Sequence, residues 1–497
     1  MKILLVYPSY PDTFWSFKYA LRFINKSATN PPLGLLTVAA MLPPEWEQRL
    51  VDLNVRKLSD GDLRWADYVL ISAMAVQKAS TIKVIERCRA LGVKTIAGGP
   101  LFTAEPQEFP QVDHLILNEA ELTLPEFLRD LENGAPRRVY TSDQWADLSQ
   151  TPVPRWDLVE LRHYASTCLQ YSRGCPFNCE FCDITALYGR VPRTKSSAQV
   201  LAELDSLYQK GWRGNVFMVD DNFIGNAKKL KEELLPALTE WMTRHKYPFT
   251  FYTQLSINLA DDEELMNMML AAGFDMVFIG IETPNEESLA ECSKNQNKRR
   301  DLVAEVKKIQ RFGLQVLGGF IIGFDHDPPT IFEKQIEFIQ RSGIVTAMVG
   351  LLNAMRGTLL YQRLQKEERL LQGDGGLGNN TDGSLNFIPK MPREMLIDGY
   401  RKVVATIYAP EYYYRRVKEF LLEYRPFPKK SLRMSWRDLY ALTRALVQIG
   451  IFGEERRYFW QLLGWTVRKR PRAFALAVTY SIYGFHFRKV FADAKPS

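Results

Sequence analysis

Residues 171–182 read Tyr171-Ser-Arg-Gly-Cys175-Pro-Phe-Asn-Cys179-Glu-Phe-Cys182, a short segment that holds three of the chain's 6 cysteines. Three thiolates at the spacing C-x3-C-x2-C can bind three irons of a cubane cluster and leave the fourth iron without a protein ligand. Zinc would usually take four ligands, or three and a water, and no histidine lies in the segment. A redox pair would use C-x-x-C and leave the third cysteine unexplained. We therefore predict that Cys175, Cys179 and Cys182 are metal ligands.

The cysteine segment directly follows the first of six apolar runs that alternate with helical patterns over residues 164–375. Such alternation indicates a parallel sheet covered by helices. Six strand–helix units are typical of a partial (β/α)6 barrel, in which active sites lie on the loops after the strands. The predicted strands are Thr167–Tyr171, Val216–Val219, Thr250–Gln254, Met276–Ile281, Val316–Ile322 and Val345–Leu352.

A second α/β pattern precedes the barrel, over residues 1–135. Its predicted strands are Ile3–Tyr7, Arg49–Leu53, Tyr68–Ala73, Thr95–Ala97 and His114–Leu117. Fully apolar strands with helices between them predict a doubly wound, flavodoxin- or Rossmann-like domain, whose ligand crevice lies at the carboxyl ends of the strands. Small or polar residues follow these strands, so we predict that Ser72, Gly98, Gly99 and Glu119 contact a ligand.

Two further regions complete the predicted domain organisation. Residues 136–163 are polar and interrupted by prolines, which indicates a linker. After the Gly/Asn-rich stretch Gly373–Gly383, residues 376–497 are helical, basic and aromatic in pattern. No repeat of fixed period is present.

Composition and charge limit the function. The 497 residues are 46% hydrophobic and 24% charged, which excludes a disordered, fibrous or disulfide-stapled chain. Residues 425–497 hold 15 Lys and Arg against 4 Asp and Glu, a net charge of +11, whereas the whole chain carries +7. The rest of the chain is therefore slightly acidic, and the basic region predicts a local anionic partner.

The basic region also holds 14 Phe, Trp and Tyr residues. Aromatic side chains beside Lys and Arg favour the headgroup layer of an anionic bilayer. A helical cap on the barrel with a solvated basic face is the second interpretation, and nucleic-acid binding ranks last because the region shows no strand pattern. We find no signal peptide and no run of ~18 apolar residues. We expect a cytoplasmic protein, with peripheral contact at the inner face of a membrane as one interpretation.

With Phe181 in its aromatic position, the cysteine segment resembles the C-x3-C-x-aromatic-C motif of the radical SAM superfamily. The resemblance implies a [4Fe-4S] cluster with S-adenosyl-L-methionine (SAM) on its open iron. It also implies a one-electron reductant of the flavodoxin or ferredoxin type, and a 5′-deoxyadenosyl radical that removes hydrogen from an inert C–H bond.

Other strand ends match the same superfamily in order. Asp220 and Asp221 end the second barrel strand, where the superfamily places a Gly-Gly-Glu run that meets the methionine amine, although the glycines are absent here. Gly280 and Glu282 end the fourth strand, where the superfamily contacts the ribose, and residues 318–323 match the strand that meets the adenine. The resemblance thus implies a SAM site lined by Asp220, Asp221, Gly280 and Glu282, with Gln254 as a weaker candidate.

The N-terminal domain resembles the cobalamin-binding domain of the class B radical SAM methyltransferases. The matching stretches are Pro31-Pro32-Leu33-Gly34, the Ser72–Gln77 loop, Gly98-Gly99-Pro100 and Asn118-Glu119. One departure concerns cobalt: where base-off corrinoid proteins carry Asp-x-His-x-x-Gly, this chain reads Asp52-Leu53-Asn54-Val55-Arg56. Gln77, water or no ligand would then lie below cobalt. A domain that keeps the fold but binds no corrin is the alternative.

Residues Met348–Tyr361 and the helical C-terminal region resemble the hopanoid C-2 methylase group, and bacteriochlorophyll side-chain methylases share the general plan. The resemblance implies a cobalamin-dependent radical SAM methyltransferase acting on an unactivated carbon of an apolar lipid-like (hopanoid or terpenoid) or tetrapyrrole substrate. Two alternatives remain at this point. One is C–C bond formation or cyclisation on a lipid without methyl transfer, and the other is a non-catalytic corrinoid- or cluster-binding regulator.

Overall fold

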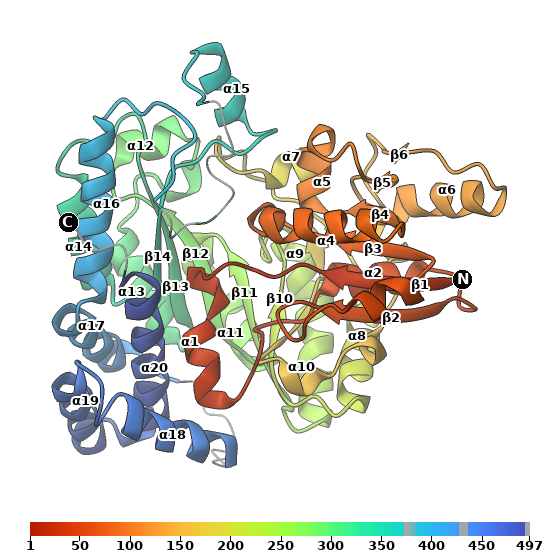
Figure 1. Ribbon diagram of the computed structural model, residues 1–497. Coiled ribbons are helices and arrows are strands. Elements are labelled where there is room, and N and C mark those ends of the chain that lie inside the picture. The colour runs from red at the N-terminus through yellow and green to blue at the C-terminus, as the bar shows by residue number, and fades with distance from the viewer. Residues whose placement is uncertain (372–378, 380, 382, 427–435, 493–497) are drawn as a thin grey trace.

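The computed structural model describes residues 1–371, 379, 381, 383–426 and 436–492. Two six-stranded parallel sheets follow each other along the chain, and a group of helices follows the second sheet (Figure 1). The predicted α/β fold class, with a doubly wound first domain, a partial (β/α)6 barrel and a helical C-terminal region, is confirmed. The predicted boundary between residues 375 and 376 lies outside the described residues.

The first sheet has the order β2-β1-β3-β4-β5-β6. Its strands are β1 (Lys2–Tyr7), β2 (Glu47–Asp52), β3 (Tyr68–Ser72), β4 (Lys94–Gly98), β5 (His114–Ile116) and β6 (Val139–Tyr140). Helices α2 (Leu33–Met41), α3 (Asp60–Trp65), α4 (Lys78–Ala90), α5 (Pro100–Ala104) and α6 (Ala120–Glu132) connect them. In β1, Leu4 and Val6 belong to one hydrophobic core, whereas Ile3 and Leu5 belong to another. The strand is therefore apolar throughout because it is buried on both faces.

Strand β6 was not predicted, and it lies within residues 136–163, which we had interpreted as a linker. It pairs in parallel with β5 through Leu115 and Ile116. Strand β6 has two residues and lies among prolines and charged residues, so it shows no apolar periodicity in the sequence. It is recognised only by its pairing with β5.

The second sheet has the order β7-β10-β11-β12-β13-β14. Its strands are β7 (Thr167–Leu169), β10 (Gly214–Met218), β11 (Phe249–Leu255), β12 (Phe274–Glu282), β13 (Gln315–Ile322) and β14 (Ala347–Leu351). Its main connecting helices are α8 (Ser197–Gln209), α10 (Leu235–Arg244), α11 (Glu263–Ala272), α13 (Leu302–Phe312) and α14 (Ile331–Ser342), and β8 (Ser172–Arg173) pairs with β9 (Arg193–Thr194) beside α7 (Ile184–Tyr188). All six predicted barrel strands are present.

Burial alternates along β11. Phe249, Phe251, Thr253 and Leu255 are buried, whereas the residues between them are partly exposed. Because successive side chains of a strand point to opposite faces, one face of this strand packs against helices and the other faces the barrel interior. Tyr252 and Gln254, on the inner face, line the cavity described below.

The helices after the barrel are α15 (Leu359–Lys366), α16 (Arg393–Tyr408), α17 (Pro410–Glu423), α18 (Trp436–Gln448), α19 (Arg456–Lys469) and α20 (Phe474–Val490). The segment after β1, with η1 (Phe14–Ser16), α1 (Lys18–Leu21) and η2 (Arg22–Ile24), crosses to these helices, and α1 lies beside α20 (Figure 1). Phe14 stacks on Phe487 of α20 at 4.3 Å between ring centroids. None of the helices in the described ranges is both long and apolar enough to cross a membrane.

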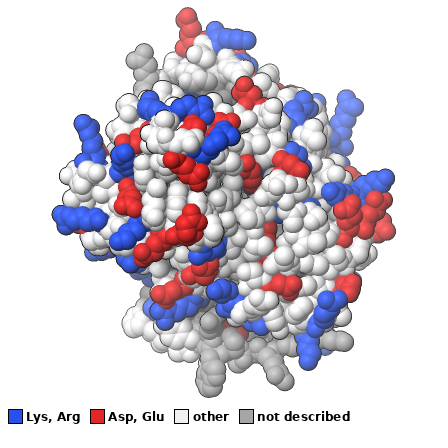
Figure 2. All heavy atoms as spheres, turned by 90° about the vertical axis from the view of Figure 1, so that its right-hand side faces the viewer, with Lys and Arg blue, Asp and Glu red and all other residues white. Residues whose placement is uncertain are grey.

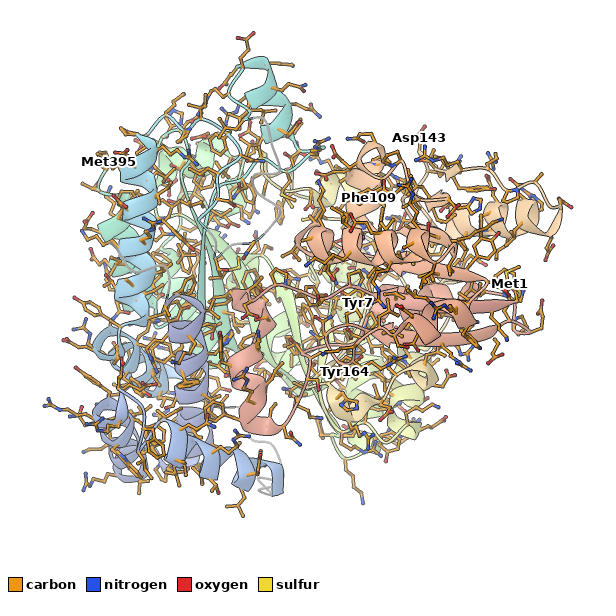
Figure 3. The ribbon with its side chains drawn as sticks, viewed as in Figure 1. Met1, Tyr7, Phe109, Asp143, Tyr164 and Met395 are labelled. Carbon is orange, nitrogen blue, oxygen red and sulfur yellow. The ribbon has the colours of Figure 1, made fainter. Side chains whose placement is uncertain are left out.

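The carboxyl edge of the first sheet faces the second sheet. Tyr7, at the end of β1, and Tyr164, just before β7, lie in the middle of the molecule, whereas Met1 lies at its outer edge (Figure 3). The Tyr164 hydroxyl donates to Asp52 Oδ2 at 3.0 Å, which ties the start of the barrel to the end of β2. The two strand edges that the sequence marks for ligands are therefore brought together.

Candidate active site

The three cysteines lie on the loop between β8 and α7. The loop is closed by backbone hydrogen bonds from Cys175 N to Gly189 O (3.3 Å) and from Cys182 N to Cys179 O (3.1 Å). Gly174 has φ of +93°, and a Cβ there would lie 3.0 Å from Gly189 O. Only glycine adopts such a conformation without strain. The path of the loop itself thus requires the glycine that precedes Cys175.

Two aspartates after β10 hold the backbone of this loop. Asp220 is fully buried and accepts hydrogen bonds from Tyr171 N (3.3 Å) and from the backbone N and the hydroxyl of Ser172. Asp221 accepts from Gly174 N at 2.9 Å. Burial raises the pKa of Asp220 to about 7 and that of Asp221 to about 6, although the hydrogen bonds lower both.

These contacts change the interpretation of Asp220. We predict from the sequence that Asp220 lines the SAM site, but its carboxylate is hydrogen-bonded to Tyr171 and Ser172 and does not line the cavity. Asp221 does line the cavity. Asp220 is therefore a positioning residue for the cysteine loop.

The donor set of the loop fits an iron–sulfur cubane. Cys179 is buried and Cys175 and Cys182 are half-buried. In the described part of the chain, no three His, Cys, Asp or Glu side chains gather closely enough to hold one metal ion. A cubane differs from a single ion because each of its irons takes one thiolate, so three neighbouring thiols at separate positions suit three of its corners.

A partly buried lysine, Lys294, which we did not predict, faces the same thiols. Lys294 Nζ lies 2.7 Å from Glu282 Oε1. Burial raises the pKa of all three thiols, and the charge of Lys294 lowers it. Burial would lower the pKa of Lys294, but Glu282 and Cys179 raise it well above its ordinary value. Lys294 therefore favours thiolates. No sequence signal pointed to it, because only the fold brings residue 294 to the cysteines.

Gly280 and Glu282 lie at the carboxyl end of β12, as predicted, around the thiols and not among the cavity-lining residues. Asn297 Nδ2 donates to both Gly280 O and Ile281 O at 3.0 Å, and Gln335 Nε2 donates to Glu282 O at 3.1 Å. Glu282 has φ of +65°, a rare conformation for a residue with a side chain. The side-chain amides thus fix an unusual strand end beside the cysteine loop.

Phe181, the aromatic residue of the motif, packs on the barrel core at 6.1 Å from the ring of Phe324, which follows β13. In β13 itself, a Cβ on Gly319 would lie 2.7 Å from the ring of Phe278, and one on Gly318 would lie 2.8 Å from the ring of Phe320. Internal packing is therefore one reason for these two glycines, which the resemblance assigned to an adenine site.

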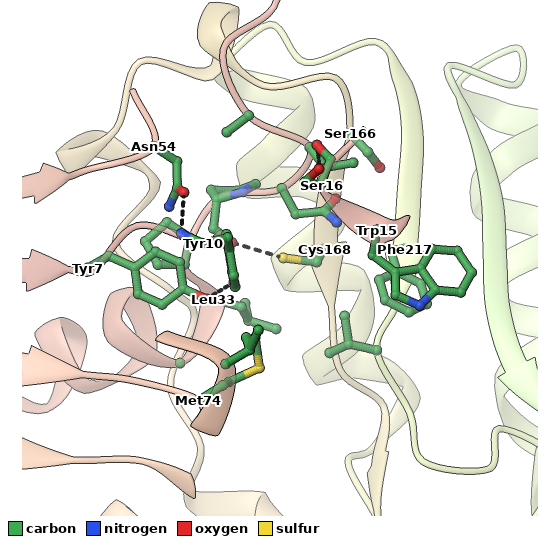
Figure 4. Close-up of a pocket in the computed structure, with 18 of the residues that line it drawn as sticks. Tyr7, Tyr10, Trp15, Ser16, Leu33, Asn54, Met74, Ser166, Cys168 and Phe217 are labelled. Carbon is green, nitrogen blue, oxygen red and sulfur yellow. Dashed lines mark hydrogen bonds between the residues drawn. The ribbon is translucent and has the colours of Figure 1, made fainter. Parts of the chain in front are cut away.

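A cavity of about 1950 Å³ lies between the two sheets (Figure 4). Its walls are the carboxyl edge of the first sheet, the inner face of the barrel, the segment after β1 and parts of α18 and α20. Figure 4 shows Asn54 and Met74 on the side of the first sheet, and Cys168 and Phe217 on the side of the barrel. Ligand pockets for drug-sized molecules hold up to ~1,000 Å³. This cavity therefore has room for a large cofactor together with a substrate.

The predicted residues divide into two groups. Those that line the cavity are Ser72, Gly98, Gly99, Glu119, Asp221 and Gln254. Those that do not are Gln77, Phe181, Asp220, Gly280, Glu282 and the three cysteines. The cavity nevertheless includes Arg173 and Asp183, on either side of the cysteine loop. The first sheet and the loop thus face a common space.

The glycines of the first sheet have a structural reason of their own. A Cβ on Gly98 would lie 2.6 Å from Ile116 O. Gly99 has φ of +91°, and a Cβ there would lie 2.8 Å from Ser72 Oγ. Both glycines are therefore required because other parts of the chain pass close to them. This reason is additional to the predicted approach of a flat ligand.

Gln77 is wrong as a candidate for the lower face of cobalt. Its side chain is buried, with Oε1 accepting from Met74 N (2.9 Å) and Nε2 donating to Pro8 O. Both ends of the amide therefore hold the Ser72–Gln77 loop. Asn54, in the position expected for the missing histidine motif, lines the cavity and donates to Asp52 Oδ1 at 2.8 Å. Among the described residues no histidine lines the cavity.

Glu119 lines the cavity but is not a free ligand group. It is buried, and its carboxylate pairs with Arg173 (2.8 Å) and Arg193 (2.9 Å). Glu121 pairs with the other side of Arg173 at 2.8 Å. Arg173 lies two residues before Cys175, so this ion-pair network connects the end of β5 to the cysteine loop.

Known proteins match each part of this architecture. Residues 24–128 match the B12 binding domain, residues 169–339 match the radical SAM superfamily, and residues 358–497 match a domain of unknown function, DUF4070. The cobalamin-dependent SAM radical enzyme OxsB has the same fold, with a TM-score of 0.63 at 14% identity over 99% of this chain and 80% of OxsB. The radical SAM methyltransferase TsrM from Kitasatospora setae, solved with cobalamin and a [4Fe-4S] cluster, aligns with a TM-score of 0.62 at 13% identity over 90% of this chain and 98% of TsrM. Fold and site together define a radical SAM enzyme with an N-terminal cobalamin-binding domain.

Two curated relatives place the chain more closely. An uncharacterized methyltransferase of Synechocystis sp. is 43% identical over 98% of this chain and 91% of the relative. Hopanoid C-2 methylase of Rhodopseudomonas palustris is 34% identical over 93% of this chain and 88% of that enzyme. The chain belongs to this family of cobalamin-dependent radical SAM methyltransferases. Its cofactors are a [4Fe-4S] cluster, SAM and cobalamin, and it requires an external reductant. The expectation that the N-terminal domain binds a corrin is thus supported, and the non-catalytic alternative is not.

Proposed function

We propose that the protein transfers a methyl group to an unactivated carbon of a hopanoid-like polycyclic lipid. The observation that carries the proposal is the continuous cavity, which joins the edge of the corrin-binding sheet to an apolar barrel interior. Chain-wide identity to hopanoid C-2 methylase supports the substrate class. When bound, the cofactors supply a transferable methyl group and a radical that activates a C–H bond.

The substrate side of the cavity is lined by apolar and aromatic side chains of the barrel strands. They are Phe217, Tyr252, Met276, Phe278, Leu317 and Met348. Phe217 and Tyr252 stack at 4.7 Å, and the Trp15 ring meets Phe278 edge-on at 5.4 Å. Such a surface binds a rigid hydrocarbon by area and shape and keeps water away from a reactive radical.

Most of the predicted site residues then have a proposed role. Cys175, Cys179 and Cys182 hold three irons of the cluster, and Asp220 holds their loop in place. Gly280 and Glu282, with Lys294, surround the SAM bound at the open iron. The surface that contacts the corrin is formed by Ser72, Gly98, Gly99 and the residues after β1. Gln254 and Asp221 line the cavity that the cysteine loop and the first sheet share.

The C-terminal region is part of the proposal. Its +11 net charge over residues 425–497 supports peripheral contact with an anionic membrane, from which a lipid substrate would come. A flavodoxin- or ferredoxin-type protein is the proposed electron donor.

Comparative mass spectrometry of lipids and pigments tests the proposal. A strain that lacks the gene should lose hopanoids that are one methylene heavier than the remaining ones. Loss of a methylated tetrapyrrole would move the proposal to pigments. In vitro, the purified holoenzyme with hopanoid should form S-adenosylhomocysteine and 5′-deoxyadenosine together. Formation of 5′-deoxyadenosine alone would favour cyclisation or C–C coupling without methyl transfer.

A further inference from the structure

Large apolar side chains are exposed along one edge of the C-terminal helices. This α18–α19 edge consists of Tyr440, Val447, Ile451, Phe452, Trp460 and Val467. Phe452 is 77% exposed and Ile451 is 59% exposed. The aromatic residues of α20 behave differently, because Tyr480 and Phe487 are buried against the rest of the fold. The predicted helical cap therefore applies to α20, whereas the exposed apolar side chains gathered on α18 and α19 indicate an interaction site.

The members of the edge lie together. Trp460 Nε1 donates to Gly450 O at 2.9 Å, which fixes the indole against the turn that carries Ile451 and Phe452. Val467 follows Trp460 by two helical turns, so the two lie on the same face of α19. On α18, Tyr440 and Val447 are related in the same way. The apolar surface thus runs along both helices and the turn between them.

Basic side chains border the edge. Arg456 and Arg457 lie at the start of α19, and Arg468 and Lys469 lie at its end. All four are exposed, and none has an ion-pair partner among the residues that the structure describes. On the side of the first sheet, by contrast, acidic and basic side chains are intermixed (Figure 2). Apolar and aromatic side chains flanked by unpaired cations suit the headgroup layer of an anionic bilayer.

The cavity reaches the surface next to this edge. Ala441 and Leu442 of α18 line the cavity on the same helix that exposes Tyr440 and Val447. Arg472 and Ala475, before and within α20, line the cavity and are themselves exposed. The mouth of the cavity is therefore bordered by α18, which also contacts η2, and by the start of α20.

We infer that the α18–α19 edge docks on an anionic bilayer and that the adjacent mouth admits the apolar substrate directly from it. The inference of docking is argued only from the surface residues, whereas the inference that substrate enters at this mouth rests on the proposed function. An acidic electron donor fits this surface less well, because it must approach the cysteine loop. That loop precedes α7 near the top of Figure 1, whereas α18 and α19 lie at the bottom.

Vesicle flotation of the full-length holoenzyme tests the docking. We expect the protein to float with vesicles of phosphatidylcholine and phosphatidylglycerol in equal amounts, and to bind phosphatidylcholine vesicles far more weakly. Phe452→Glu should weaken binding by more than about tenfold, because it removes a ring that inserts into the bilayer. Arg456→Gln with Arg457→Gln should weaken it about thirtyfold at low salt. Ile388→Glu, at an exposed apolar residue outside the edge, is the matched control and should float like the wild type.

Other outcomes would overturn the docking. They are equal flotation of all variants, absence of flotation, a dimer that Phe452→Glu dissociates, and loss of flavodoxin binding in the arginine variant while flotation is unchanged. A dimer would assign the edge to a second copy, and the flavodoxin result would assign it to the electron donor.

The route of the substrate needs a second measurement. With hopanoid embedded in the anionic vesicles, Phe452→Glu should slow methylation more than about tenfold; with hopanoid in detergent micelles, it should stay within about twofold of the wild type. Equal loss in both would overturn the route. If the wild-type enzyme methylates hopanoid in neither, the proposed function fails while flotation still decides the docking.

Discussion

The two sheets use the same edge in different ways. At the carboxyl edge of the barrel, the groups that matter are side chains: three thiols, the carboxylates of Asp220 and Asp221, and the ammonium of Lys294. At the carboxyl edge of the first sheet, Gly98 and Gly99 line the cavity on the side proposed for the corrin, and the charged residue Glu119 pairs with arginines of the barrel domain. A cluster needs particular ligand atoms, whereas a large flat cofactor needs a surface of the right shape.

The ion-pair network joins the two edges. Arg173 carries one bond to Glu119 and two to Glu121, and it directly precedes the cysteine loop. Cluster and corrin must face one substrate from fixed positions, so a buried, hydrogen-bonded link between their loops positions both. The comparison predicts that some substitutions affect one edge and that others affect both.

The largest and most one-sided effect is expected for Cys179→Ala. Loss of one iron ligand should exceed the ~10–100-fold effect of altered groups behind a metal ligand, so SAM cleavage should fall more than about a hundredfold. Cobalamin binding should remain. The measurements are iron content, the electron paramagnetic resonance signal of the reduced cluster, 5′-deoxyadenosine formation and the visible spectrum of bound cobalamin.

Cys88→Ala is the matched control, because Cys88 is a buried thiol in the core of the first sheet. It should keep the iron content and the SAM cleavage rate of the wild type. Loss of cobalamin together with the cluster in Cys179→Ala would mean that the two edges do not bind their cofactors independently.

Arg173→Ala should affect both edges. It removes the arginine partner of Glu121 and one of the two arginines that pair with Glu119, and breaking a buried ion pair typically costs about 3–5 kcal/mol. We expect the free energy of unfolding in urea to fall by about that amount, with lower contents of both iron and cobalamin. Glu119→Ala in the Arg173→Ala background should cost less than Glu119→Ala alone. Additive losses would show that the network does not couple the edges.

Asp220→Asn should change the pH dependence of stability. Asp220 keeps its proton to about pH 7 in the folded chain, but only to about pH 3.9 when unfolded. The folded chain binds more protons in that window, so the wild type loses up to about 4 kcal/mol of stability as pH rises from about 4 to about 7. The asparagine variant should lack this loss in urea unfolding at several pH values. A control at the exposed Asp398 (Asp398→Asn) should run parallel to the wild type.

Much of this site could be predicted from the sequence, because local patterns define it. The cysteine spacing requires one short loop, and the apolar runs define the strands that it joins. Gly280 and Glu282 could be placed at a strand end for the same reason. Lys294 could not, because its contact with the thiols depends on how the chain after β12 returns to the loop.

Contacts between residues far apart in the sequence could not be predicted either. Glu119 and Gln77 are polar, as ligand residues often are. Their side chains are already hydrogen-bonded to protein groups 54 and 69 residues away in the sequence. Asp220 and Asp221 both bond the backbone of the cysteine segment, but Asp220 is fully buried and Asp221 also lines the cavity. A strand end predicts where a side chain lies, and the tertiary fold decides whether it faces ligand or protein.

The smallest expected effects separate two uses of glycine at the corrin edge. Gly99→Ala should lower the free energy of unfolding by about 1–3 kcal/mol, because it forces a side chain onto a backbone with φ of +91° and toward Ser72 Oγ. Iron content should not change. Urea unfolding and cobalamin titration of the same samples measure both consequences.

Gly34→Ala is the informative partner of that variant. Gly34 lies in α2 and lines the cavity, and a Cβ there would meet no protein atom within 4 Å. Alanine in a helix is favoured over glycine by about 0.5–1 kcal/mol, so the protein without cobalamin should become slightly more stable. If the corrin approaches α2 closely, cobalamin should nevertheless bind more weakly. A more stable variant with unchanged cobalamin affinity would show that the corrin does not approach α2. Gly99 could not locate the corrin either, because the fold itself requires a glycine at that position.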